Sequence, residues 1–460
     1  MARTTITGTM STDLIKHTDL HEASGGLATD GIAARLWSQW ERFPMASQGL
    51  LSVFDQAIVS GTSFVAVVII GRMTSPDELG LYYLTLSIVL VMLGIQEQLI
   101  TAPYTVYFRR RHGTELALYA GSTWIHHFAL TIVTVVGLLA TIAVLSVAGS
   151  TSIVPGLWAL VGSGPLLLLR ESIRRFAFAN LELGAAIAVD FIVAVAQLGG
   201  LLLLAYMGGL TLFSIYGVMG AACALACLGW FLFDPPVVRF QRRRFVSDWW
   251  HNWEFSKWAL RSFIVGNTTI YIMPWILNLA VGAAATGVLG ACNTLVGVTN
   301  IFLAGVANVL TPQAAHAFVA GGRADLIRLL TRTAAILSLV LGSFSLLLLV
   351  TGDRLAVFVY GSQYQGCGPI LATLALSVWM TALGMTTGTG LWAIDQPKAN
   401  FLADIWWNSV TLIAAVFLVS PFGALGAALA MLAGTTTAAI VRTVILVRAL
   451  EPGRLKAHAN

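Results

Sequence analysis

Charged residues are scarce in this chain. Asp, Glu, Lys and Arg make up 10% of its 460 residues, and hydrophobic residues make up 57%. Soluble domains carry about 25% charged residues. No polar stretch beyond the N-terminal tail is long enough to fold by itself, so the composition excludes a large soluble domain.

Cysteine is also scarce. The four residues, Cys223, Cys227, Cys292 and Cys367, are scattered, and three of them lie in apolar segments. Cys223 and Cys227 are four positions apart on an expected helix, but no His or carboxylate accompanies them. We therefore expect small hydrophobic side chains here, with no metal site, no structural disulfide and no cofactor.

Two further signals are missing. Residues 1–31 are polar and rich in Ser and Thr, without the apolar core and cleavage site of a secretory signal. We expect them to form a cytoplasmic tail. No glycine-rich loop of the kind that cradles phosphates occurs, so ATP is not expected to be the direct energy source.

Long apolar stretches recur along the chain. A spanning helix needs roughly 20 mostly apolar residues, and in lipid its backbone must satisfy its own hydrogen bonds. We therefore predict an all-α polytopic membrane protein with about twelve transmembrane helices. The predicted spans are 50–71, 81–103, 117–147, 155–175, 183–205, 211–233, 258–280, 288–310, 333–352, 369–391, 402–420 and 425–446.

The placement of basic residues predicts the orientation. Of the 26 Lys and Arg residues, only Arg72 and Arg354 fall on the side opposite the N-terminus. Cytoplasmic loops carry the excess of Lys and Arg, so both termini are predicted to lie in the cytoplasm, with the chain integral to a bacterial cytoplasmic membrane. The basic residues are spread over separate loops, which excludes nucleic acid as a partner.

The sequence also indicates an internal duplication. Tyr216-Gly-Val-Met-Gly-Ala-Ala-Cys-Ala224 and Phe422-Gly-Ala-Leu-Gly-Ala-Ala-Leu-Ala430 share one pattern, and each opens the last span of a half. Trp37-Ser-Gln-Trp40-Glu41 and Trp250-His-Asn-Trp253-Glu254 precede spans one and seven. Six spans is an even number, so the halves should share one orientation, with a pseudo-twofold axis along the membrane normal and a cavity between them.

This plan predicts five segments. Residues 1–49 form a tail, with an amphipathic interfacial helix over Ile32–Phe43. Residues 50–233 form the N-lobe and 258–446 the C-lobe, joined by an inter-lobe loop over 234–257, and 447–460 form the second tail. Aromatic residues of the loop beside Arg242–Arg244 are expected either to contact anionic lipid or to serve only as interfacial anchors.

Ionisable groups within a bilayer are costly and usually face a cavity or a partner. Apart from two histidines, those of this chain lie in the cytoplasmic third of the spans. We selected the polar and charged residues that are best placed to line a cavity or contact substrate. They are Asp55, Gln56, Glu97, Gln98, Arg170, Glu171, Arg174, Arg175 and Arg261.

Several of these positions allow a second interpretation. The span-four arginines either bind an anionic head group or extend to the interface with Glu171 as partner. Asp55 either lines a cavity, binding a cation, a proton or a sugar hydroxyl, or forms an interhelical hydrogen bond. For the adjacent His126 and His127 we expect hydrogen-bonded structural roles. Asp190 and Asp404 lie near the span ends, where pairing with Arg is expected.

Several motifs resemble those of the polysaccharide transporter family, the O-antigen and exopolysaccharide flippases of the multidrug, oligosaccharidyl-lipid and polysaccharide exporter superfamily. Their order and the six-plus-six plan agree over residues 50–446. The motifs are Phe54–Phe64, Gly71-Arg-Met73, Leu79-Gly-Leu-Tyr82, Tyr360-Gly-Ser-Gln-Tyr364, Asp395-Gln-Pro-Lys398 and Pro421–Ala428.

The resemblance implies that a lipid-linked oligosaccharide, carried on a polyprenyl diphosphate, is moved from the inner to the outer leaflet for polysaccharide or lipopolysaccharide biosynthesis. Cationic cavity residues would meet the diphosphate, membrane lipid would hold the tail, and a cation or proton could couple transport. The cationic groups of this chain sit low in the spans, and twelve spans also fit a multidrug or organic-cation antiporter of the same fold. A membrane enzyme is not expected, because the longest outer loop, about Asp353 to Gly368, is short.

Overall fold

The computed structural model describes residues 44–149, 152–233 and 238–451, with side chains described from residue 51 onward. The predicted interfacial helix over Ile32–Phe43 lies outside these residues. The chain divides into two compact units, Met1–Ser52 and Val53–Asn460. Apart from the first turns of α2, every described helix belongs to the second unit.

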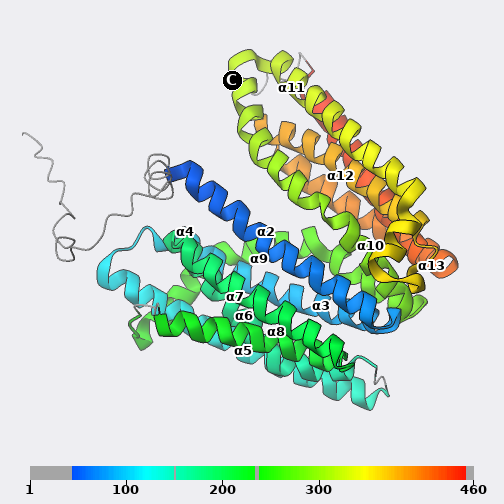
Figure 1. Ribbon diagram of the computed structural model, residues 1–460. Coiled ribbons are helices and arrows are strands. Elements are labelled where there is room, and N and C mark those ends of the chain that lie inside the picture. Colours follow the sequence, from blue (N-terminus) through cyan, green and yellow to red (C-terminus); the bar gives the residue numbers. More distant parts are fainter. Residues whose placement is uncertain (1–43, 150–151, 234–237, 452–460) are drawn as a thin grey trace, which may run out of the picture. The chain divides into compact units, whose positions relative to one another are not determined.

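Every regular element in the described ranges is a helix, which confirms the predicted all-α class (Figure 1). Nine of these helices are long and apolar enough to cross a membrane. The first half contains α2 (Pro44–Met73), α3 (Pro76–Gln96), the π-helical turn η1 (Glu97–Thr101), α4 (Ala102–Phe108), α5 (Gly113–Val147), α6 (Val154–Asn180), α7 (Leu183–Tyr206) and α8 (Leu212–Phe233). The second half contains α9 (Arg242–Ala280), α10 (Ala283–Gly297), α11 (Thr299–Tyr360), the short 3-10 helix η2 (Ser362–Tyr364), α12 (Gly368–Ala393) and α13 (Pro397–Ala449).

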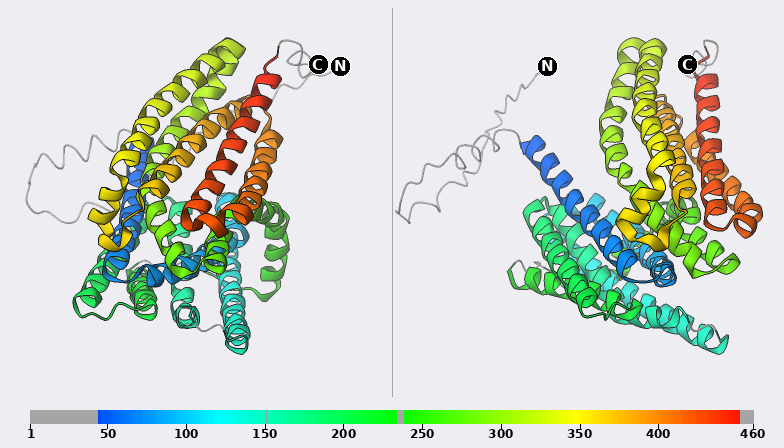
Figure 2. Two further views of the ribbon diagram at one scale, coloured as in Figure 1. Left: turned by 90° about the vertical axis from the view of Figure 1, so that its right-hand side faces the viewer. Right: turned by 45° about the vertical axis from the view of Figure 1, so that its right-hand side comes forward.

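Two of the long helices reverse direction at a glycine. In α11, Gly322 has φ 61° and ψ −147°, and in α13, Gly423 has φ 58° and ψ −132°. A side chain disfavours a positive φ, whereas glycine adopts it readily. Both reversals can be followed in Figure 2, in the yellow-green to yellow part of the chain and in the orange to red part.

Buried side chains confirm the reversal in α11. Leu303 and Leu337 belong to one buried cluster, and Leu310 and Leu330 belong to another. Residues so spaced on either side of Gly322 meet only if the two parts of α11 run antiparallel. Since α10 continues through a helical Val298 into α11, and α3 continues through η1 into α4, the described helices form six rods in each half, as the sequence predicts.

Two sets of helices pack side by side. In the first half α5, α6, α7 and α8 pack on one another, and in the second half α11, α12 and α13 do so (Figure 1). The main contact between the halves is that of α3 with α10.

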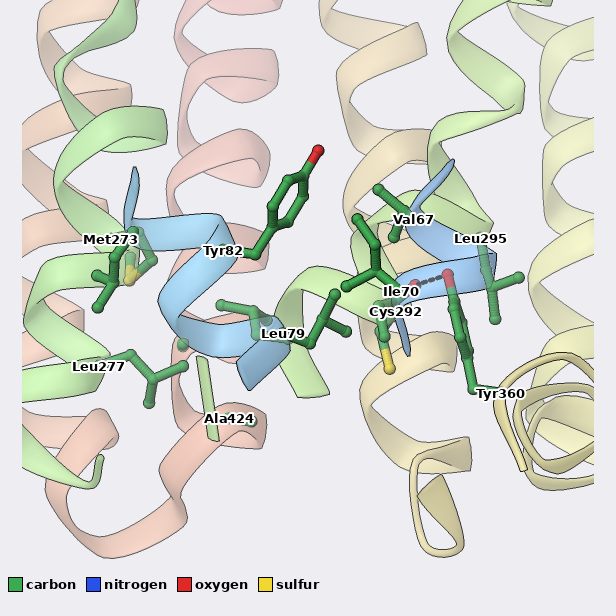
Figure 3. Close-up of a cluster of buried hydrophobic side chains, with 14 of the residues drawn as sticks. Val67, Ile70, Leu79, Tyr82, Met273, Leu277, Cys292, Leu295, Tyr360 and Ala424 are labelled. Carbon is green, nitrogen blue, oxygen red and sulfur yellow. Dashed lines mark hydrogen bonds between the residues drawn. The ribbon is translucent and has the colours of Figure 1, made fainter. Parts of the chain in front are cut away.

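The largest hydrophobic cluster joins both halves. It contains Ile70 and Leu79 from α2 and α3 together with Leu277, Cys292 and Tyr360 from α9, α10 and α11 (Figure 3). These residues lie at the end of the bundle where α2 ends and α3 begins, which we call the Arg72 end. One apolar core therefore holds the two halves together there.

At the opposite end each half has a hydrophobic cluster of its own. Tyr104, Trp124 and Trp230 belong to a cluster formed by α4–α8 and a residue of the segment before α9. Leu310 and Leu446 belong to a cluster formed by α11, α12 and α13. The halves therefore share a core at one end and have separate cores at the other.

Two glycines bring α3 and α10 into backbone contact. A Cβ on Gly80 would lie 1.9 Å from the carbonyl oxygen of Ala283, and one on Gly287 would lie 2.0 Å from that of Pro76. Small residues at such crossings let helix backbones approach closely in membranes. No side chain fits at either position without separating the two helices.

The second glycine of the repeated motif permits a close contact in each half, with α6 for Gly220 and with the preceding part of α13 for Gly426. A Cβ on Gly220 would lie 2.8 Å from Ser163 Cβ, and one on Gly426 would lie 1.9 Å from the Leu418 carbonyl oxygen. The first glycine of the second copy is Gly423, which makes the reversal in α13.

We expect Gly80→Ala to destabilise the protein although alanine favours helices. The added Cβ must push α10 away, and overpacking of this kind costs about 1–3 kcal/mol. The matched control is Gly61→Ala in α2, where nothing lies within 4 Å of the new Cβ, so a gain of about 0.5–1 kcal/mol is expected. Thermal unfolding of the two variants in one detergent measures the difference, and equal midpoints would contradict the close contact.

Candidate functional site

Arg174 is the centre of an ion-pair network between α2, α6 and α7. Its Nη2 lies 2.7 Å from Asp55 Oδ2, its Nε 2.7 Å from Asp190 Oδ2, and its Nη1 3.5 Å from Glu171 Oε1. The side chains of Asp55 and Asp190 are 1% and 0% exposed. One guanidinium therefore joins three helices through carboxylates that solvent does not reach.

Arg170 extends the same network. It pairs with Asp190 and, at 3.5 Å, with Glu171. Arg170 and Arg174 are four residues apart on α6, so they lie on one face of the helix. Asp190 comes from α7, which follows α6 after a short turn with Leu181 at φ 63°. The predicted pairing of Asp190 with arginine is confirmed, but the pairs are buried in the protein.

Arg175 carries the network towards solvent. Its Nε lies 2.8 Å from Glu171 Oε1, and its Nη2 lies 3.3 Å from Glu97 Oε1. The side chains of Arg175 and Glu97 are 38% and 40% exposed. The network thus runs from a buried centre at Arg174 to a half-exposed edge at Glu97.

The formal charges of this network do not cancel. Asp55, Glu97, Glu171 and Asp190 supply four negative charges, and the three arginines supply three positive charges, which leaves −1. Asp55 Oδ1 is buried without a hydrogen-bond partner, and so is Arg170 Nε. An uncompensated charge is costly away from water, so one proton or one monovalent cation would complete the balance.

Asp55 is also the anchor of its part of α2. Its neighbours Val53 and Phe54 are 63% and 57% exposed, whereas Asp55 is 0% exposed. Gln56 is exposed and donates to Ser60 Oγ at 3.0 Å within the same helix. The Asp55–Arg174 pair therefore fastens a helix segment that is otherwise largely uncovered, and Gln56 is not part of the network.

Glu97 and Gln98 lie in the π-helical turn η1. The N–H of Ala102 donates to the Glu97 carbonyl, five residues back, and Pro103 in the next position has no N–H to donate. Such turns are frequent at functional sites. Gln98 is half-buried in this turn. Of these two residues, Glu97 is the one that joins the ion-pair network.

A buried polar chain beside the network was missed by the sequence analysis. Gln96 Nε2 donates to Ser172 Oγ at 2.7 Å, and that hydroxyl lies 3.0 Å from His127 Nδ1. His126 Nε2 lies 2.8 Å from the carbonyl oxygen of Phe245. Both histidines are hydrogen-bonded, as predicted. Of the residues in this hydrogen-bonded series, only His127 was considered in the sequence analysis. Gln96, which is adjacent to the charged Glu97, was passed over.

Arg261 is not brought to the network. It is exposed on α9, and its guanidinium carbon lies 4.7 Å from the centroid of the Trp258 ring. Asp404 is also apart: it pairs with Arg442, whose Nε donates to Asn400 Oδ1 at 3.2 Å. The predicted pairing of Asp404 with arginine is therefore confirmed.

Residues 242–257, expected as part of the inter-lobe loop, form the first turns of α9. The face of this segment that packs against the first half carries both polar and aromatic residues, and Trp249 and Phe255 contact His126 and Tyr107 there. Asp248 Oδ1 lies 3.4 Å from Arg111 Nη1, and Asn252 accepts a hydrogen bond from Tyr119 at 2.9 Å. Trp250, on the opposite side, is 62% exposed. Polar and aromatic residues of this segment thus both contact the first half, and Trp250 lies away from it.

Comparison with known proteins rests on three-dimensional structures, because no protein-family model and no curated protein sequence matches the chain. A structure described as the lipid II flippase MurJ in an inward closed conformation has a TM-score of 0.68 and 14% identity, covering 87% of each chain. An inward-facing multidrug resistance MATE family transporter of the MOP superfamily has a TM-score of 0.65 and 14% identity, covering 88% of this chain and 94% of its own. The chain has the fold of the MOP superfamily transporters.

The MOP fold is matched more closely in one conformation than in another. An outward-facing structure of a multidrug resistance MATE family transporter, also 14% identical and covering 88% of this chain, has a TM-score of 0.51. The helices of this chain are therefore arranged more like the inward-facing structure.

We expect Arg174→Ala to cause a large loss of stability. It leaves two buried carboxylates unpaired, and removal of one partner from a buried ion pair costs about 3–5 kcal/mol. Arg175→Ala removes a half-exposed arginine from the same helix and should cost less than about 1 kcal/mol. Thermal unfolding in detergent compares the two, and a similar midpoint for both variants would show that the buried pairs do not stabilise the fold.

Proposed function

We propose that this chain is an alternating-access transporter that moves a lipid-linked oligosaccharide, a polyprenyl-diphosphate glycan, across the cytoplasmic membrane of a bacterium for polysaccharide biosynthesis. The observation that carries the proposal is the division of the hydrophobic core, shared at the Arg72 end and separate at the other. Halves that share a hydrophobic core at one end only can rock about that end, which is how many transporters of repeated halves work.

Orientation belongs to the proposal as well. With both termini in the cytoplasm, the Arg72 end faces outwards and the end with separate cores faces the cytoplasm. A substrate made inside the cell would then enter between the halves at the cytoplasmic end and leave once the Arg72 end has opened.

The choice of substrate is supported by the sequence motifs and by the likeness to a structure described as a lipid II flippase. We propose that the diphosphate of the substrate binds to arginines whose side chains are accessible. Arg175 is half-exposed at the edge of the network, and Arg261 is exposed beside an aromatic ring. Arginine suits phosphate oxygens because its N–H groups form a planar fork.

Arg170 and Arg174 receive a different role in this proposal. Their guanidinium groups are already neutralised by buried carboxylates, so a diphosphate would have to displace Asp55 or Asp190. We assign them to a coupling site, in which a proton or cation binds at Asp55 and Asp190 and removes the uncompensated charge. Protonated Asp55 would hold Arg174 less strongly and release the exposed segment of α2.

A second candidate is an organic-cation antiporter of the same fold. The net negative network favours a positively charged substrate, and the MATE structure is described as a multidrug resistance transporter. Proteoliposomes that contain the purified protein separate the two functions. Uptake of a fluorescent organic cation without flipping of a lipid-diphosphate oligosaccharide would support the antiporter and overturn the flippase.

We expect Asp55→Ala and Arg170→Ala each to lower the rate of flipping of a fluorescent lipid-diphosphate oligosaccharide in proteoliposomes by about tenfold, because each removes a charged hydrogen bond from the network. The matched control is Arg328→Ala, which removes an 80% exposed arginine from a surface pair. Insertion is checked by protease protection. If both network variants flip the lipid at the rate of the unmodified protein, Asp55 and Arg170 are not part of the proposed site.

We expect Asp55→Asn to transport at a rate that no longer depends on an imposed proton or sodium gradient, since asparagine is neutral at every pH and cannot exchange a bound ion. Asp325→Asn, in an exposed surface pair, should keep the dependence of the unmodified protein. The measurement is the initial rate with and without each gradient. A gradient dependence that survives in Asp55→Asn would place the coupling site elsewhere.

A further inference from the structure

The proposed function gives no role to Arg72 and Gln363, two polar residues at the Arg72 end. Arg72, at the end of α2, donates from Nη1 to the carbonyl oxygens of Phe358 and Val359 at 2.7 and 3.1 Å. Both carbonyls belong to the last turn of α11. A side chain of the first half thus holds the end of a helix in the second half.

The opposite contact is made by Gln363. This residue lies in η2, directly after α11, and its Nε2 donates to the carbonyl oxygens of Gly71 and Thr74 at 2.8 and 3.0 Å. Gly71 is in the last turn of α2, and Thr74 follows that helix. Each helix end therefore supplies the donor for the other.

Three of the four acceptors in this exchange, those of Phe358, Val359 and Gly71, are carbonyl groups in the last turn of a helix, which the helix itself leaves free. The last four carbonyls of a helix have no partner inside it, and they form its negative end. A cation at that end is stabilising, and in Arg72 the cation comes from the neighbouring helix. The Arg72 and Gln363 donors thus bind carbonyl groups that would otherwise need a hydrogen bond from water.

The neighbouring contacts keep the two ends close. A Cβ on Gly71 would lie 2.8 Å from Tyr360 Cδ1, so glycine is needed where α11 passes α2. Tyr83 donates to the Gly290 carbonyl at 2.8 Å and lies 2.5 Å from Thr294 Oγ1, which joins α3 to α10 beside them.

We propose that Arg72 and Gln363 form a reciprocal latch that keeps the Arg72 end closed and must open once in each transport cycle. The inference rests on the proposed alternating access, and it names the residues that set the balance between the closed and open states. Arginine keeps its charge and glutamine has none to lose at any working pH. The latch is thus insensitive to protons, in contrast to the Asp55 network.

The two sites are connected by α2 itself. Asp55 and Arg72 lie on one continuous helix, and at 1.5 Å per residue they are about 26 Å apart. A rod of this length is fastened at one end by Arg174 and at the other by the latch. Release of Asp55 would leave the latch as the main polar attachment of α2 to the remainder of the described chain.

Spin labels measure the closure of this end directly. Met207 and Phe422 are 70% and 55% exposed, and each lies where a rod of its half ends at the Arg72 end. We would label Met207→Cys with Phe422→Cys, with the four native cysteines replaced by alanine, and measure their distance distribution by pulsed electron resonance in lipid nanodiscs. The unmodified latch should give mainly the short, closed distance.

Loss of a donor should shift this distribution. Arg72→Ala and Gln363→Ala are each expected to lower the ratio of closed to open populations by about tenfold, which is the size of one charged or paired hydrogen bond. Arg72→Lys keeps the charge at the helix end and should restore part of the closed population. Gln363 lies in a short exposed segment, so Gln363→Ala tests the latch even if the Arg72 variants fold poorly.

The chain offers a matched control for each donor. Arg354 is an exposed arginine at the same end, and Gln365 is an exposed glutamine two residues after Gln363. Neither contacts α2 through a hydrogen bond among the described residues. Arg354→Ala and Gln365→Ala should leave the distribution unchanged.

The outcomes separate this proposal from the proposed function. If the latch variants shift the distribution no more than the controls do, the latch is overturned. If they open the Arg72 end but the unmodified protein flips no lipid-diphosphate oligosaccharide, the latch stands and the proposed substrate fails. If no variant and no ion gradient alters the distribution, both the latch and alternating access are overturned.

Discussion

The cost of an unpaired charge away from water is the constraint on which the first half of this protein depends. Arg170 and Arg174 can be largely buried on one helix only because carboxylates from α2, α6 and α7 surround them, and Arg175 extends the network to Glu97 in the π-helical turn. The pairs hold α6 and α7 together and attach a segment of α2 that has few other contacts. A residual negative charge in such a place makes the attachment sensitive to any ion that can reach it.

Apolar packing supplies the complementary constraint. At the Arg72 end, glycines let α3 and α10 touch through their backbones, and the buried cluster continues from one half to the other. At the far end the buried clusters are separate, and the halves meet there through the first turns of α9, which contact the first half. Polar groups therefore attach α2 at Asp55 and at its Arg72 end, while hydrophobic burial selects the end at which the halves share a core.

Much of this arrangement is readable from the sequence, and the rest is not, for identifiable reasons. Hydropathy predicts the rods, and the paired glycine motif predicts the close contacts at Gly220 and Gly426, because both depend on local composition. Charges in apolar spans identify Asp55, Arg170 and Arg174, since such charges are rare. The sequence also predicts that Asp190 pairs with arginine, but its sharing between Arg170 and Arg174 depends on how α6 and α7 pack, which hydropathy does not encode. The acceptors of Arg72 and Gln363 are backbone carbonyls, which every residue has, so no sequence pattern marks them.

Arg174 contacts three carboxylates on three different helices, and this restricts how the sequence can drift. A chain that replaces this arginine by a neutral residue strands several acids at once, and a chain that replaces one acid leaves the others to share the guanidinium. Relatives of this protein should therefore exchange these positions as a group: either the whole set of acids and arginines persists, or an apolar or amide-bearing set replaces it.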